Sequence, residues 1–122
     1  MPSPPVALRI EQAGPVTVIA IVTPRIPIEA RDFFEEQVLA AVARVSQPRV
    51  ALDFSAVEFI SSAILGKLIK LNGAITTDRG GQLVLCGLIP RIADVFKTTG
   101  LDRLFTIHKN REEAVRSFEP AP

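Results

Sequence analysis

Two adjacent serines, Ser61 and Ser62, are the most distinctive polar feature of the sequence. They stand at a junction, because the apolar run before them and the apolar run after them have different periods. A serine hydroxyl at such a place has three uses. It can attack a substrate, it can accept a phosphate, or it can cap the first turn of a helix.

Attack on a substrate is not supported by the surrounding residues. A hydrolase needs a general base within hydrogen-bond reach of the serine, and the one histidine, His108, follows the last strand that we predict. There is no G-x-S-x-G elbow, and Lys67 is five residues from Ser62 rather than three. We therefore expect a binding protein without catalytic residues, not an enzyme.

The composition limits which kinds of ligand and which cellular location we expect for the protein. The 122 residues carry 14 basic and 13 acidic side chains, so the strong basic excess of most nucleic-acid-binding domains is absent. With one cysteine (Cys86) and one histidine, we expect no disulfide, no metal site and no cofactor. No apolar run reaches the roughly 18 residues of a membrane span, and no signal peptide is present, which indicates a cytoplasmic protein.

A buried strand is predicted directly before the serine pair, and a helix directly after it. The run "RVALDFS" is almost continuously apolar, as in strands that are covered on both faces. A strand that leads into a helix places the serines at the carboxyl edge of a sheet, where α/β proteins usually bind ligands or partners. The helix is predicted from the spacing of Ile64, Leu68, Leu71 and Ile75, with Leu65 and Ile69 widening the apolar face and Lys67, Lys70 and Asp78 on the solvent side.

The other elements predict a small α/β domain. "VALRIEQ" and "VTVIAIV" around Ala13-Gly14-Pro15 indicate an opening hairpin, and "QLVLCGL" and "RLFTI" indicate two later strands. One helix is predicted from about Ile28 to Gln47, with an inward face made by Phe34, Val38, Ala41, Val42 and Val45. Another is predicted to begin at Pro90 and to end at a cap at Gly100. The last is predicted over "NREEAVRSF", with Asn110 and Glu113 as a capping box. The order ββαβαβαβα favours a mixed, mostly parallel sheet packed by about four helices. We expect one domain over residues 1–122, with its core at about 8–117 and short proline-rich tails.

Several residues near the serines have a structural interpretation and a functional one. Gly66 and Gly73 each cost the helix roughly 1 kcal/mol relative to alanine, and close packing of the helix on the sheet is the favoured explanation. Gly66 could also let a partner backbone approach the serine loop. Asp53 is expected to orient the loop at the end of its strand, and Cys86 is expected to be a buried apolar residue.

At "VALDFSAVEFISSAILGKLI" the sequence resembles the STAS domain, and within that family the bacterial anti-sigma factor antagonists. The family pattern is D-(L/F)-S-x-V-x-F-(I/M)-D-S-(S/T/A)-G-L-G followed by an apolar helix. The downstream run "GGQLVLCGLIPRIADVFKTTGLDRLFTIHKNREEAV" is also similar to the family, so the resemblance covers roughly residues 8 to 117. The residues that match the first pattern are Asp53, Phe54, Ser55, Val57, Phe59, Ile60, Ser62, Leu65 and Gly66.

The resemblance implies a switch. In these antagonists a serine at the helix start is phosphorylated by an anti-sigma factor that is also a serine kinase, and a metal-dependent phosphatase removes the phosphate. The unphosphorylated form binds the kinase and frees the sigma factor. By position the phosphate acceptor is Ser62, and the contacts with the partner are expected from Ser61, Ser62, Ala63, Ile64, Gly66, Lys67 and Arg25.

This sequence also departs from the family pattern. Ser61 stands where the family has aspartate, and Ile64 stands where it has glycine. The early G-E-(L/I)-D loop is replaced by "VTPRIPIEA". A second hypothesis therefore stays open: a constitutive STAS interaction module, in a signalling scaffold or a transport complex, in which Ser62 only caps the helix. In either case we expect a monomer or a weak homodimer.

Overall fold

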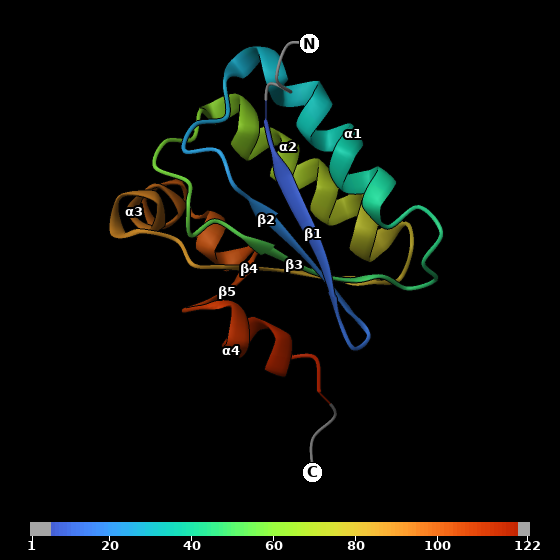
Figure 1. The fold of residues 1–122 in the computed structure, drawn as a ribbon. Helices are drawn as coiled ribbons and strands as arrows, with labels where there is room; N and C mark the ends of the chain where they lie inside the picture. Colours follow the sequence, from blue (N-terminus) through green and yellow to red (C-terminus); the bar gives the residue numbers. More distant parts are fainter. Residues whose placement is uncertain (1–5, 120–122) are drawn as a thin grey trace.

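The computed structural model describes residues 6–119, and the predicted proline-rich tails lie almost entirely outside this range. Five strands form one sheet in the order β1-β2-β3-β4-β5 (Figure 1). β1 (Leu8–Ala13) and β2 (Val16–Ile21) are antiparallel, whereas β3 (Arg49–Asp53), β4 (Gln82–Cys86) and β5 (Thr106–His108) continue the sheet in parallel. The opening hairpin and the mostly parallel sheet are thus confirmed.

Helices cover both faces of the sheet. α1 (Arg31–Ala41), α2 (Ser62–Asn72) and α3 (Pro90–Thr99) cover one face, and the short α4 (Arg111–Arg116) lies against the other (Figure 1). The main core lies between the sheet and the three longer helices, and its largest fully buried side chains include Phe34, Phe54 and Phe96. A smaller apolar cluster, with Val18, Cys86 and Phe118, lies beneath α4. The predicted element order is confirmed.

Caps and glycines place most helix ends where the sequence predicts them. Pro90 is in the first turn of α3, and Gly100 ends that helix in the left-handed conformation, with φ +78°. Asn110 caps α4 by accepting the Glu113 N–H at 2.9 Å. The Glu113 carboxylate reaches back one residue further than in a regular capping box and accepts the Lys109 N–H.

Three element boundaries differ from the prediction. The helix predicted to include Ile75 and Asp78 ends as an α-helix at Asn72 and continues as a π-helix over Gly73–Thr77. α1 ends at Ala41 rather than near Gln47, and Val45, predicted to point inward, is 36% exposed. Arg79, in the turn before β4, holds the segment after the helix in a non-helical path by donating to the carbonyl oxygens of Val42, Ala43 and Val45 at 2.6, 3.1 and 2.5 Å. The last strand is Thr106–His108, since the residues before it form a 3₁₀ turn, Leu101–Arg103.

Candidate partner-binding site

The two serines have different positions at the start of α2. Ser61 is the N-cap: its backbone is extended, and its Oγ accepts the Ile64 N–H at 3.4 Å. Ser62 is the first residue of the helix and is exposed. The hydroxyl of Ser61 therefore serves the helix, while the hydroxyl of Ser62 is available at the surface.

An exposed face of α2 begins at Ser62. Gly66 and Ile69 follow it at helical spacing (i+4 and i+7), and both are exposed, Ile69 to 44%. A Cβ added at Gly66 or at Gly73 would meet no heavy atom within 4 Å. The prediction that these glycines serve close packing on the sheet is therefore wrong, as is the inward position predicted for Ile69. We call Ser62, Gly66 and Ile69 the serine face.

Two of the residues predicted to contact a partner are turned inward. Ile64 is completely buried in the main core. The side chain of Lys67 is only 13% exposed, and its Nζ lies 2.9 Å from Asp32 Oδ1 and 3.0 Å from Glu35 Oε1 of α1. The hydrogen bonds that Lys67 donates to these two carboxylates raise its pKa. Lys67 therefore connects α2 to α1, and its predicted position on the solvent side is wrong. Ala63, beside Ser62, is partly exposed.

Arg25 and Phe59 lie on the loops that precede α1 and α2. The two residues form an isolated parallel bridge, and the Arg25 guanidinium carbon is 5.6 Å from the centre of the Phe59 ring. Phe59 is 50% exposed. A guanidinium over an exposed aromatic ring gives a cation–π contact that holds the two loops together at the surface. Arg25 is thus a surface residue, as predicted, with Phe59 as an addition.

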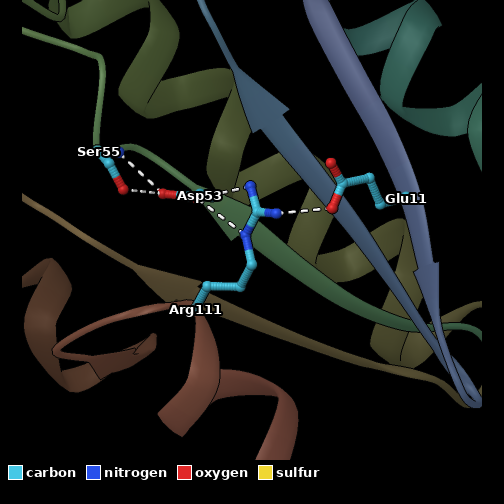
Figure 2. Close-up of polar contacts among 4 residues, drawn as sticks. All are labelled: Glu11, Asp53, Ser55 and Arg111. Carbon is cyan, nitrogen blue, oxygen red and sulfur yellow. Dashed lines mark hydrogen bonds and ion pairs between the residues drawn. The ribbon is translucent and has the colours of Figure 1, made fainter.

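Asp53 holds the loop that leads from β3 to the serines. Its Oδ1 accepts the N–H of Ser55 at 2.9 Å and also the Ser55 hydroxyl (Figure 2). Its Oδ2 accepts two bonds from Arg111 of α4, at 3.2 Å from Nε and 3.0 Å from Nη2. Arg111 Nη1 in turn lies 2.7 Å from Glu11 Oε2 on β1. The prediction that Asp53 orients this loop is confirmed.

The surroundings of Asp53 keep it ionised and leave little space. Burial raises its pKa, but the hydrogen bonds from Ser55 and Arg111 outweigh burial, so that the pKa of Asp53 is lowered. Gly87 packs against this group with φ +73°, and a Cβ there would lie 2.5 Å from Ser55 Oγ and 2.9 Å from Asp53 Oδ1. A glycine is therefore required at this position.

Other candidate residues do not form a second reactive site. Cys86 is fully buried, and burial together with the nearby negative charge of Asp53 raises its pKa to about 12, so that the thiol stays neutral. His108 ends β5. Among residues 6–119 no side chain is hydrogen-bonded to Ser62, and no group of three His, Cys, Asp or Glu residues could hold a metal ion. No helix in this range is long and apolar enough to cross a membrane.

Sequence reasoning missed Arg111, Glu11 and Gly87. The spacing Asp53-x-Ser55 is a local signal for a side chain that accepts from the backbone two residues on. Arg111 and Glu11 come from distant parts of the chain, and nothing near them in the sequence pairs them with Asp53.

Sequence comparison relates the chain to one domain family. The family model of the STAS domain matches residues 7–114. BtrV from Bordetella bronchiseptica, provisionally named as an anti-sigma factor antagonist, is 35% identical over 86 residues, which are 70% of this chain and 73% of BtrV.

Solved structures share the fold. An anti-sigma-factor antagonist (STAS) domain protein from Planctomyces limnophilus superposes with a TM-score of 0.80 at 24% identity, covering 92% of this chain and 97% of that one. The phosphorylated form of the Bacillus cell fate determinant SpoIIAA superposes with a TM-score of 0.68 at 18% identity, covering 93% of this chain and 100% of that one. At these identities the structures show the fold alone.

Proposed function

This chain belongs to the STAS domain family, and we propose that it binds an anti-sigma factor through the serine face of α2, under the control of phosphorylation at Ser62. The observation that carries this proposal is the serine face itself. An exposed hydroxyl, a helical glycine with no internal packing partner and an exposed isoleucine follow one another along the helix. The name of the similar protein BtrV supports the choice of partner.

The glycine explains how a partner could bind this face closely. Gly66 costs the helix about 1 kcal/mol relative to alanine, and no neighbouring side chain uses the space that it leaves. A partner backbone can approach α2 there, and it would find an apolar contact at Ile69 and a hydroxyl at Ser62 on either side. We also propose that Arg25, Ser61 and Ala63 contact the partner at the rim of this interface.

Phosphorylation at Ser62 is compatible with the fold. A phosphate adds about −1.5 to −2 charges at pH 7, and at the first residue of α2 it would meet the positive end of the helix dipole and unpaired backbone N–H groups. The fold would tolerate it, and the cost would fall on the complex through bulk and charge at the contact. SpoIIAA, which shares the fold, exists in a phosphorylated form.

The proposed cycle follows from these properties. Unphosphorylated protein binds an anti-sigma factor that is also a serine kinase, and the sigma factor is released. Transfer of phosphate to Ser62 ends the binding, and a metal-dependent phosphatase restores it. The chain acts as a binding protein and not as an enzyme, in the cytoplasm where sigma factors act.

A titration calorimetry experiment with the cognate anti-sigma factor tests the proposal. Ser62→Asp should weaken binding at least about tenfold, equivalent to about 1.4 kcal/mol, and leave the circular dichroism spectrum unchanged. Ser46→Asp is the matched control, because Ser46 is also an exposed serine but lies before β3, at the other end of that strand. It should bind like the wild type.

Equal affinities for wild type and Ser62→Asp would contradict control by phosphorylation. They would favour the constitutive interaction module, for which Ser61 in place of the family's aspartate is the supporting observation. Loss of binding in Ser46→Asp as well would indicate an effect of charge rather than of position.

A further inference from the structure

β1 is the long edge of the sheet. Within residues 6–119 it pairs only with β2, and it runs for six residues, whereas the opposite edge strand, β5, has only three. Natural proteins usually protect a long edge with proline, lysine or a bulge. β1 reads Leu-Arg-Ile-Glu-Gln-Ala and has no proline, lysine or bulge; its two charged side chains, Arg9 and Glu11, have opposite signs, and Ile10 at its middle is 53% exposed.

The backbone of β1 offers hydrogen-bonding groups at regular places. Val22 donates to the Ala7 carbonyl at 2.9 Å, and this pair has the same register as the rest of the hairpin. In an antiparallel pair, bonding toward the neighbour alternates along the strand. Ala7, Arg9 and Glu11 therefore bond toward β2, while the N–H and C=O groups of Leu8, Ile10 and Gln12 point to the free edge.

The side chains of β1 divide between the two faces of the sheet. Arg9 lines the same cavity as Asp53 and Arg111 on the α4 side, and Glu11 is bonded to Arg111 on that side. Leu8 and Ile10 lie on the opposite side, where they line a shallow groove with Val6, Phe33 and Gln37. The free edge is thus charged on one face and apolar on the other.

We propose that β1 pairs with β1 of a second copy of this chain, antiparallel and centred on Ile10, so that two sheets become one continuous sheet. In this register Ile10 lies opposite Ile10, and Leu8 lies opposite Gln12 of the second copy. The N–H and C=O groups of Leu8, Ile10 and Gln12, which point to the free edge, then face the same groups of the second copy. This gives about six backbone hydrogen bonds across the two-fold axis.

The charges select this register. With Ile10 at the centre, Arg9 lies opposite Glu11 of the second copy, twice by symmetry, in the non-hydrogen-bonded positions where side chains are closest. If the pairing is centred on Arg9 instead, Arg9 lies opposite Arg9 of the second copy, and if it is centred on Glu11, Glu11 lies opposite Glu11. Like charges at directly opposite positions are destabilising. A shift of the register by a single residue would place backbone groups that point to the free edge of one copy opposite residues whose backbone groups point toward β2 of the other copy.

The apolar face adds to the contact. Ile10 of each copy would cover Ile10 of the other, and the groove beside Leu8 and Phe33 would be shielded by the incoming strand. A contact made by one edge strand and a few side chains is at the small end of specific interfaces. The dimer should therefore be weak and concentration-dependent. It uses a different edge of the molecule from α2 and is independent of anti-sigma factor binding.

Sedimentation velocity of the whole chain over a range of concentrations tests the pairing. The wild type should show a sedimentation coefficient that rises toward that of a dimer, and Ile10→Lys should stay monomeric. Ile69→Lys is the matched control, because Ile69 is a similarly exposed isoleucine on α2. It should self-associate like the wild type.

A charge-reversal pair tests the register. Arg9→Glu sets two carboxylates opposite each other across the contact, and Glu11→Lys sets two cations opposite each other. Each variant alone should therefore self-associate at least about tenfold more weakly than the wild type. A mixture of the two variants restores both opposite-charge pairs and should form a heterodimer.

Three results would overturn the proposal. The first is a wild type that stays monomeric at every concentration. The second is a mixture of the two charge variants that stays monomeric while the wild type dimerises, and the third is unaltered dimerisation of Ile10→Lys.

Discussion

At the start of α2, the hydroxyl of Ser61 caps the helix whereas that of Ser62 is exposed, and variants of the two residues should differ in stability. Ser61→Ala should lower the free energy of unfolding by about 0.5–2 kcal/mol, because an N-cap is lost, and the 3.4 Å length of its bond favours the low end. Ser62→Ala should change that free energy by less than about 0.5 kcal/mol, because the side chain is exposed. Urea unfolding followed by circular dichroism measures both. A larger loss in Ser62→Ala would identify Ser62 as the cap.

Gly66 provides a second test at the residue scale. Gly66→Ala should stabilise the protein by up to about 1 kcal/mol, because alanine is the better helix former and the added methyl group has free space. The same methyl group should weaken binding of the anti-sigma factor. Thermal unfolding and titration calorimetry measure the two effects.

Gly73→Ala is the control for this substitution. Gly73 also has free space for a methyl group, but it begins the π-helix that follows α2, about 10 Å from Gly66. It should stabilise the protein similarly and leave the affinity unchanged. A Gly66→Ala variant with wild-type affinity would show that no partner backbone approaches α2 at this point.

Some of these residues could be identified from the sequence, and others could not. The serines and Asp53 stand at a strand-to-helix junction, which is a local pattern, and their roles as cap and loop anchor were predictable. The openness around Gly66 and the inward turn of Lys67 depend on how α2 lies against α1. The packing of α2 against α1 joins segments that are far apart in the chain, so the hydrophobic periodicity of α2 alone could not predict it.

At the scale of elements, α4 is held to the sheet by Arg111, and acid should weaken this attachment. The lowered pKa of Asp53 means that its stabilisation is complete above the unfolded-state pKa of about 3.9 and is lost as the pH falls through the lower folded-state value. Arg111→Met should cost about 1–3 kcal/mol at pH 7, near the low end because Arg111 is 35% exposed.

Unfolding curves measured from pH 7 down to below the pKa of Asp53 test this attachment. The difference between wild type and Arg111→Met should shrink as the pH falls, because protonation removes the same stabilisation from the wild type. Arg116→Met, at an exposed arginine of the same helix, should follow the wild type. A constant difference over the whole range would show that Arg111 acts by packing and not through Asp53.

Element ends were less predictable than elements. α2 and α3 begin and α3 ends at local signals, a serine, a proline and a glycine, and these predictions hold. α1 stops early, and Arg79, from a distant turn, donates to the carbonyl oxygens of Val42, Ala43 and Val45 in the segment that follows it. The apolar spacing that extended the predicted helix to Val45 carries no information about that arginine.

At the scale of the whole molecule, the sequence predicts the architecture well, since buried strands alternate with amphipathic helices and the opening hairpin has a clear turn. It does not predict that the molecule has two separate surfaces, the serine face and the free edge of β1. Those depend on which side chains remain exposed after packing. We expect substitutions at Ile10 to affect self-association alone, and substitutions on the serine face to affect partner binding alone.

The central claim is that Ser62 carries the switch, and mass spectrometry of the protein isolated from its own cells, with and without stress, tests it most directly. Trypsin should release residues 50–67 as one peptide, which contains Ser55, Ser61 and Ser62, so fragmentation must locate the phosphate. We predict a single phosphate on Ser62 whose occupancy changes with stress. A peptide without phosphate under every condition, or with phosphate only on Ser55 or Ser61, would contradict the account.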